Sequence, residues 1–226
     1  MYIPRLFAEE QPDELTAFMV AHPLGALITV DASGALFGTH LPLVFDASRG
    51  PRGVLEGHVA RANPHHALAR EGAEALVIFT GPNAYVTPNW YPGKAEHGRE
   101  VPTWNYVAVH AYGTLRFIDD PEWLLPHLRR LTDRSETARQ APAGDAPWRV
   151  DDAPPEFIAQ RMKAIVGLQI TVTRLEGKWK MSQNRAPDAI EGVIAGLGAS
   201  PSAMDREVSA IVAERRTRST EQNHGA

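Results

Sequence analysis

The chain has 226 residues, of which 43% are hydrophobic and 22% are charged, a composition typical of a soluble globular protein with a sizeable core. It contains no cysteine, which excludes disulfides, thiolate zinc sites, iron–sulfur clusters and a cysteine nucleophile, and which suits a reducing compartment. The net charge of -4 excludes a general attraction to nucleic acid, so contact with DNA is possible only through a local basic patch.

The N-terminal half combines short helices with a series of strands. Acidic residues begin, and a His-Pro pair ends, a segment with apolar side chains at helical spacing, which predicts a helix over residues 12–21. Asn63 and Pro64 predict a second helix that ends near residue 70, because Asn caps a first turn and Pro suits the first helical position. Turn-forming residues separate several β-rich segments, and these predict strands at 25–30, 35–45, 54–60, 75–80 and 84–87.

The C-terminal half begins with a loop at 89–100 and a strand at 101–113, and then changes to helical spacing. The predicted helices begin after residue 120, at Pro155, at Pro187 and after the Ser200-Pro201 pair. Between them, strands at 168–175 and 178–181 are expected on either side of a Glu176-Gly177 turn. Residues 217–226 are expected to form a disordered tail.

These elements predict a mainly β (α+β) fold, an antiparallel closed or split β-barrel of about six or seven strands with peripheral helices. We expect a single domain over residues 1–216. The N-terminus lacks a basic region followed by an apolar run, and no stretch reaches the length of a membrane span. A cytoplasmic protein without membrane contact is therefore expected.

The strand VPTWNYVAVHAYG at 101–113 has two chemically different faces, because side chains alternate across a strand. One face is compact and carries Thr103 and Asn105 near the start of the strand. The other is broad and able to form hydrogen bonds, and it carries Trp104, Tyr106, Ala108, His110 and Tyr112. The pattern alone leaves open what the broad face contacts.

Three other stretches are rich in polar side chains near strand ends: FGTHLPL at 37–43, LEGHVARANPHH at 55–66 and KWKMSQNR at 178–185. In the first, Thr39 lies on the same face as two leucines, and His40 lies opposite. If the leucines are buried, His40 faces away from the core. It is then either a structural histidine or a functional one.

In the second stretch, Arg61 and Asn63 could converge on one anion together with the free amides of the following helix. The alternative is that Arg61 pairs with a carboxylate such as Glu56. A zinc site made of His58, His65 and His66 is a weaker alternative, because adjacent histidines on a helix point about 100° apart.

The last stretch places Lys180 and Ser182 on one face of a strand, and Gln183 and Arg185 on the other. This is a dense set of hydrogen-bond donors for the end of a strand. The alternative is a hydrogen-bonded turn in which Asn184 or Arg185 caps a helix.

Several sequence motifs resemble those of the PaiB-type family, described as FMN-binding negative transcriptional regulators. In order along the chain they are MYIPRLF, GTHLPL, EGHVARANPH, GPNAYVTPNWY, VPTWNYVAVHAYG and KMSQNR. The resemblance extends over residues 1 to about 212. It implies a split-barrel fold akin to the pyridoxamine-phosphate-oxidase-like flavoproteins, a homodimer, and FMN held at the subunit boundary.

Given that resemblance, the broad face of the strand at 101–113 is expected to meet the second subunit and to border the isoalloxazine ring. The phosphate is expected at Arg61, Lys180 and Arg185, because a dianion needs fixed cationic donors. The expected cofactor-binding residues are Thr39, His40, Arg61, Asn63, Thr103, Trp104, Asn105, Tyr106, Lys180, Ser182, Gln183 and Arg185. No metal site and no catalytic residue are identified.

Three functions remain open from the sequence. The first is a flavin-binding repressor, as the family description implies, although the dense charges near residues 206–218 are mixed in sign and no recognition-helix motif is present. The second is a flavin-dependent oxidoreductase acting on a small molecule, for which His40, His58 and His110 have suitable intrinsic acidity. The third is a flavin carrier or sensor without turnover.

Overall fold

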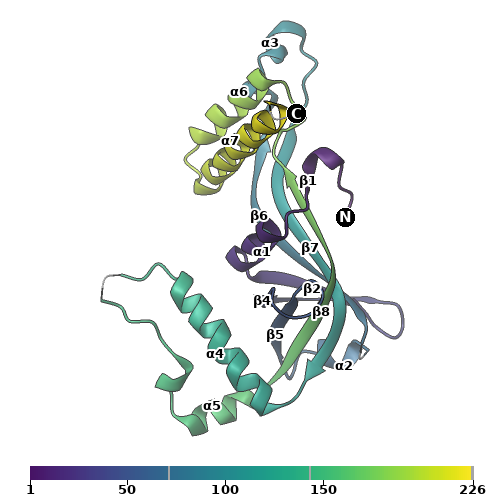
Figure 1. The fold of residues 1–226 in the computed structure, drawn as a ribbon, viewed down its shortest axis with the longest axis vertical. Coiled ribbons are helices and arrows are strands. Elements are labelled where there is room, and N and C mark those ends of the chain that lie inside the picture. Colours follow the sequence, from purple (N-terminus) through teal and green to yellow (C-terminus); the bar gives the residue numbers. More distant parts are fainter. Residues whose placement is uncertain (71, 143, 225–226) are drawn as a thin grey trace. The chain divides into compact units, whose positions relative to one another are not determined.

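The computed structural model describes residues 1–70, 72–142 and 144–224. In this part of the chain, eight strands form a sheet with the order β3-β2-β6-β7-β8-β5-β4, and β1 pairs with β8 (Figure 1). The strands are β1 (Ala8–Glu9), β2 (Leu24–Val30), β3 (Leu36–Pro42), β4 (Val44–Asp46), β5 (Val54–Ala60), β6 (Glu74–Val86), β7 (Thr103–Ile118) and β8 (Ile165–Lys180). The helices are α1 (Pro12–Ala21), α2 (His65–Leu68), α3 (Gly93–His97), α4 (Pro121–Ala138), α5 (Pro155–Met162), α6 (Pro187–Gly198) and α7 (Ala203–His224), with 3-10 turns η1 (Arg5–Phe7), η2 (Pro88–Trp90) and η3 (Val150–Asp152).

The chain divides into two compact units, each built from separate parts of the sequence. Unit 1 consists of Met1–Leu15, Thr80–Val109 and Glu176–Ala226, and unit 2 consists of Thr16–Phe79 and His110–Leu175. Strands β6, β7 and β8 each contribute residues to both units. The single domain expected over residues 1–216 stays a prediction, since three strands run through both units.

The core of unit 2 follows the alternation that strands impose. Strand β2 buries Gly25, Leu27 and Thr29, and its antiparallel register with β3 places Leu27 opposite Thr39. Strand β5 is buried from Val54 to Gly57, since it pairs with β4 on one side and with β8 on the other. The predicted strand at 35–45 is therefore two strands, and the chain changes pairing partners between them.

The predicted turn at Glu176-Gly177 is wrong, because β8 runs without interruption from Ile165 to Lys180. A Cβ atom on Gly177 would lie 2.3 Å from Leu15 Cδ2 and 2.8 Å from the carbonyl oxygen of Glu9. Glycine is needed here because α1 and β1 approach the strand closely, and not because the chain reverses. The extended segments predicted at 75–80 and 84–87 are likewise one strand, β6.

Helix α7 continues to His224, where the sequence predicts a disordered tail over 217–226. Residues 225 and 226 lie outside the described part of the chain. Arg218 forms ion pairs with Glu14 and Glu214, and Arg215 pairs with Glu9 and Glu14, so α7 is tied to the N-terminal segment of unit 1. Helices α6 and α7 lie side by side (Figure 1).

Unit 2 contains a buried group of ionisable side chains. His127 on α4 is fully buried, and its Nε2 lies 3.1 Å from Nδ1 of His58 on β5. Trp123 stacks on the His127 ring, with ring centroids 5.1 Å apart. Burial, and then the positive charge that His58 can carry, lower the pKa of His127 to about 4. Neutral imidazoles are therefore part of this core.

Glu56 is buried beside this histidine pair and accepts hydrogen bonds from Arg49 and Arg130. Burial alone raises the pKa of a carboxyl group, but the hydrogen bonds from the two guanidinium groups outweigh it and hold the pKa of Glu56 below its usual value. The charged carboxylate thus keeps two cations at the surface of unit 2. Among the described residues, none of the helices combines the length and apolar composition that crossing a membrane requires.

We predict that stability falls as the pH is lowered from about 6.5 toward about 4, because the unfolded chain then binds a proton on His127 that the folded chain excludes. The slope from this residue is at most about 1.4 kcal/mol per pH unit. His127→Gln should flatten the decrease in the urea midpoint between neutral and acidic pH. The matched control is His40→Gln at an exposed position, and an unchanged slope in His127→Gln would contradict the prediction.

Candidate functional site

Lys180, the last residue of β8, is held against the start of β7. Its ammonium group donates hydrogen bonds to Thr103 Oγ1 at 2.6 Å and to the carbonyl oxygen of Trp104. Burial, and then the positive charges of Lys178 and Arg185, lower the pKa of Lys180. Within the described residues, no carboxylate forms an ion pair with it. Lys180 therefore combines a fixed position with a positive charge that no acidic side chain neutralises.

The turn after β8 is held by side-chain hydrogen bonds. Ser182 is buried, and its hydroxyl group lies 3.0 Å from Nδ2 of the buried Asn105. Gln183 Oε1 accepts from the amide of Met181, and Gln183 Nε2 donates to the carbonyl oxygen of Trp179, both at 2.6 Å. The hydrogen-bonded turn of the alternative is present, since the Arg185 amide also donates to the carbonyl oxygen of Ser182 at 3.0 Å.

The same turn shows backbone strain. Ser182 has a φ of 64°, and among the described residues it is the only one other than glycine with a positive φ. Such strain is retained where the surroundings fix the backbone, and it is found preferentially at functional sites. Neither Asn184 nor Arg185 caps the helix that follows, because the N-cap of α6 is Ala186.

Of the other cations near this turn, one is paired with a carboxylate and one is buried. Arg185 donates a hydrogen bond of 2.9 Å to Glu100, and its guanidinium group lies 4.6 Å from the centre of the Tyr91 ring. Lys178 is buried and donates to the carbonyl oxygen of Tyr2 at 3.1 Å, with its ammonium group 5.1 Å from the centre of the Tyr106 ring. Lys180 is thus the cation of this group that is best placed to receive an anion.

An exposed aromatic pair includes the residue whose backbone Lys180 contacts. Trp104, whose carbonyl oxygen Lys180 contacts, has a side chain that is 54% exposed, and Tyr85 on β6 is 48% exposed. Their rings meet edge to face with centroids 5.9 Å apart. The compact and broad faces predicted for β7 are confirmed near its start, since Asn105 is buried and Trp104 is exposed. Exposed aromatic rings next to a cation suit a planar ligand that carries a negative charge.

A separate polar network lies in unit 2 around the buried His65. The Nδ1 atom of His65 lies 2.9 Å from Thr39 Oγ1, and its Nε2 atom lies 2.9 Å from Thr29 Oγ1. Asn63 Oδ1 accepts from the His65 amide at 2.9 Å, and Asn63 Nδ2 donates to Thr39 at 3.2 Å. Both ring nitrogens of His65 are used in this way, which leaves none for the zinc ion considered above. His40 is exposed on the opposite side of β3.

Arg61 pairs with a carboxylate, but not with Glu56. Its two Nη atoms donate to the two carboxylate oxygens of Asp119 at 2.8 Å and 2.6 Å. This hydrogen bonding lowers the pKa of Asp119. The alternative that Arg61 pairs with a carboxylate is therefore confirmed, with Asp119 in place of the suggested Glu56, which pairs with Arg49 and Arg130.

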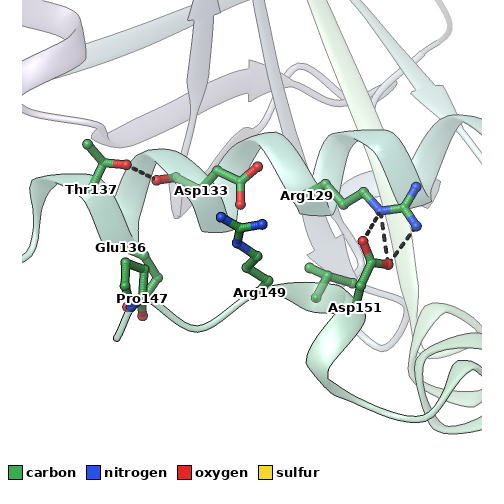
Figure 2. A pocket seen from close by; sticks show the side chains of 8 residues that line it. Arg129, Asp133, Glu136, Thr137, Pro147, Arg149 and Asp151 are labelled. Carbon is green, nitrogen blue, oxygen red and sulfur yellow. Dashed lines mark hydrogen bonds and ion pairs between the residues drawn. The ribbon is translucent and has the colours of Figure 1, made fainter. Parts of the chain in front are cut away.

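A cavity of about 390 Å³ lies between α4 and the segment that precedes α5, but it contains none of the predicted site residues. Figure 2 shows Arg129 joined to the carboxylate of Asp151, and Arg149 pointing toward Asp133. Positive and negative side chains alternate around this cavity. The lining holds two arginines and three carboxylates, and Arg129 is already paired with Asp151, so we do not assign this cavity a function.

The structure thus brings together two groups of predicted residues. Thr103, Trp104, Asn105, Lys180 and Ser182 converge in unit 1, and Thr39 and Asn63 converge in unit 2. Sequence reasoning missed Tyr85 as the aromatic partner of Trp104, and it missed the structural role of His65. The available signal for Tyr85 was that it shares one face of an extended segment with the polar Asn83, while the apolar Ala84 and Val86 share the other.

Known proteins provide an independent comparison. Residues 1–174 match the model of a family described as "Putative FMN-binding domain". An "Uncharacterized protein" of Emericella nidulans is 35% identical, with 95% of this chain and 97% of that protein covered. The Bacillus subtilis "Protease synthase and sporulation protein PAI 2" is 33% identical, with 82% of this chain and 83% of that protein covered.

A solved structure supports the same fold. The chain is similar to the "FAD and Heme binding protein" of Mycobacterium smegmatis, with a TM-score of 0.55, 18% identity, and coverage of 84% of this chain and 80% of that chain. At this identity the likeness shows the fold alone, which is an antiparallel split barrel with peripheral helices. The family match and the relatives are closer in sequence, and from these the chain belongs to the PaiB-type FMN-binding family.

Proposed function

We propose that this protein binds FMN at the group of residues that surrounds Lys180 and uses the bound flavin to regulate gene expression. The observation that carries the proposal is a cation without a carboxylate partner among the described residues, fixed against the backbone of Trp104, whose exposed ring meets that of Tyr85. FMN has a phosphate dianion and a planar three-ring body, so its chemistry fits both features. When bound, a flavin supplies an electron-accepting ring.

Lys180 is the residue that we assign to the phosphate. The other two cations predicted for this role, Arg61 and Arg185, each pair with a carboxylate, Asp119 and Glu100. Thr103 holds the Lys180 ammonium group in position, and the Asn105–Ser182 bond fixes the turn that follows it. The strained backbone of Ser182 agrees with a turn whose shape is needed for binding.

The other residues that the sequence predicts to bind the cofactor have different positions in the structure. Tyr106 lies partly buried beside Trp104 on β7, and Gln183 supports the turn through backbone contacts. Thr39 and Asn63 are tied into the network around His65, so we infer that they shape unit 2. His40 is exposed and open to a ligand.

Indirect regulation is favoured over a mechanism in which this chain binds DNA by itself. Three of the four arginines of α7 are paired with acidic residues, Arg215 with Glu9, Arg216 with Glu191 and Arg218 with Glu14, while Arg206 donates to the carbonyl oxygen of Ser200. A helix whose positive charges are neutralised in this way offers little attraction to phosphates. We therefore propose that negative regulation acts through a partner or a metabolite, in the cytoplasm.

The test of flavin binding is a fluorescence titration of FMN and of riboflavin with the purified protein. We expect the wild type to quench FMN, and Lys180→Ala to weaken FMN by about 10- to 100-fold, the effect of losing a charge-assisted hydrogen bond, while riboflavin changes little. Lys94→Ala, which removes an exposed lysine of unit 1, is the control. An equal loss for both flavins would refute the phosphate role of Lys180.

We also propose a homodimer in which the exposed face of β7 meets the second subunit. Sedimentation should give a mass about twice the 24.8 kDa of one chain, and Trp104→Glu should lower the dimer fraction, since a charge would be placed on an apolar contact. Trp148→Glu changes a similarly exposed tryptophan of unit 2 and serves as the control. A wild-type protein that sediments as a monomer would reject this interface.

The regulatory role is tested by comparing transcripts from three strains: wild type, a deletion of the gene, and a strain with Lys180→Ala. We expect a set of transcripts to be more abundant in the deletion strain than in the wild type. The same transcripts should also be more abundant in the Lys180→Ala strain, because loss of flavin removes the active form of the regulator. Transcripts that rise in the deletion but not in Lys180→Ala would separate regulation from flavin binding. No change in either strain would refute a regulatory function.

A further inference from the structure

Unit 2 contains a second cavity of about 390 Å³, distinct from the one in Figure 2. Its walls come from the start of α4, from the end of α5 and from the turn after β5. The lining residues are Arg61, Asp119, Pro121, Leu124, Ala159, Met162 and Lys163. A volume of this size lies within the range of small-molecule sites, roughly 300 to 1,000 Å³.

The inner wall of this cavity is apolar. Leu124 is 1% exposed and Met162 is 9% exposed, so both belong to the core of unit 2. Ala159 lines the cavity from the solvent side and is exposed. An apolar wall of this kind favours the hydrocarbon part of a ligand, because contact between them removes apolar surface from water.

The rim is charged, and its central group is held in place by the backbone. Arg61 Nε donates to the carbonyl oxygen of Lys163 at 2.8 Å, and Arg61 Nη2 donates to that of Ile165 at 3.0 Å. These two bonds orient the guanidinium group independently of its carboxylate partner. Asp119 occupies the fork with both oxygens although its own side chain is 61% exposed. The carboxylate of Asp119 thus shows where a carboxylate binds to the guanidinium group of Arg61.

The charges on the rim do not cancel. Arg61 and Lys163 are both cations, and Asp119 is the single acidic residue among those that line the cavity. Within the described part of the chain, Lys163 forms no ion pair. A net positive charge thus remains beside an apolar wall, and an exposed ion pair such as Arg61–Asp119 contributes little stability that a ligand would have to overcome.

We propose that this cavity binds a small monocarboxylate with an apolar body. The carboxylate is held first by Lys163, and it reaches the guanidinium group of Arg61 only by competing with Asp119. The hydrocarbon part lies on Leu124 and Met162. The site is separate from the residues around Lys180 and does not depend on flavin binding.

The experiment is a calorimetric titration of the full chain with octanoate, and with octanamide as the uncharged equivalent. We expect octanoate to bind and octanamide to bind at least about tenfold more weakly, because the amide lacks the charge that the rim recognises. Ala159→Phe should weaken octanoate by about tenfold or more, since it fills the mouth of the cavity from an exposed position and leaves the core unchanged. Equal binding of the two compounds, or no binding of either, would overturn the proposal.

Asp119→Ala provides the sharper test, because its expected effect is a gain. Removing the competing carboxylate should tighten octanoate by about threefold to tenfold. Asp151→Ala breaks the comparably exposed pair with Arg129, shown in Figure 2, and should leave octanoate binding unchanged. Weaker or unchanged binding in Asp119→Ala would overturn the assigned position of the ligand.

A final arm separates this site from the flavin site. FMN should not displace octanoate, and Ala159→Phe should leave FMN quenching unchanged. Displacement of octanoate by FMN would overturn the proposal by making the cavity part of the flavin site. Failure of FMN to bind at all would count against the proposed function and not against this cavity.

Discussion

The contact between the start of β7 and the end of β8 is the constraint on which the candidate site depends. Two side-chain bonds connect these segments, Lys180 to Thr103 and Ser182 to Asn105, although about 77 residues separate the members of each pair. Both bonds require the strands to be in a single register, because a shift of one residue would move each side chain to the opposite face. The burial of Asn105 and Ser182 makes that register costly to change, since each would lose its partner away from water.

The same register decides what the outer face presents. With Asn105 turned inward, its neighbour Trp104 is turned outward, where it meets Tyr85 from β6. The polar and aromatic parts of the candidate site are therefore consequences of one alternation. A ligand that needs a cation and a flat apolar surface finds both without any rearrangement of the backbone.

Local patterns in the sequence predicted the elements that depend on local physics. The helix at 12–21 and the strand at 54–60 match α1 and β5, because capping, proline and alternation act over a few residues. Gly177 shows where this reasoning stops. A glycine in a strand can mark a turn or a close approach of another segment, and the approach of Leu15 comes from a part of the chain more than 160 residues away.

Prediction of the site was limited in the same way, by contacts between residues far apart in the sequence. The residue types and faces around Lys180 were readable from alternation, but the partners of the arginines were not. Arg61 is neutralised by Asp119, 58 residues further along the chain, and Arg185 by Glu100, 85 residues earlier. No local pattern reports such pairs, so three candidate cations were equivalent in the sequence and became different only in the fold.

Pairing with carboxylates also explains why a chain with many arginines has so few free positive charges at these sites. Each buried or half-buried cation carries a desolvation cost, which an acidic partner offsets. Lys180, like the buried Lys178, meets that cost through neutral oxygens: a hydroxyl group and a carbonyl oxygen hold its ammonium group without cancelling the charge. Its lowered pKa is the consequence, because neutral oxygens compensate burial and the neighbouring cations only in part. An anion placed there would restore the balance, and this electrostatic deficit is the physical reason to expect a phosphate at this position.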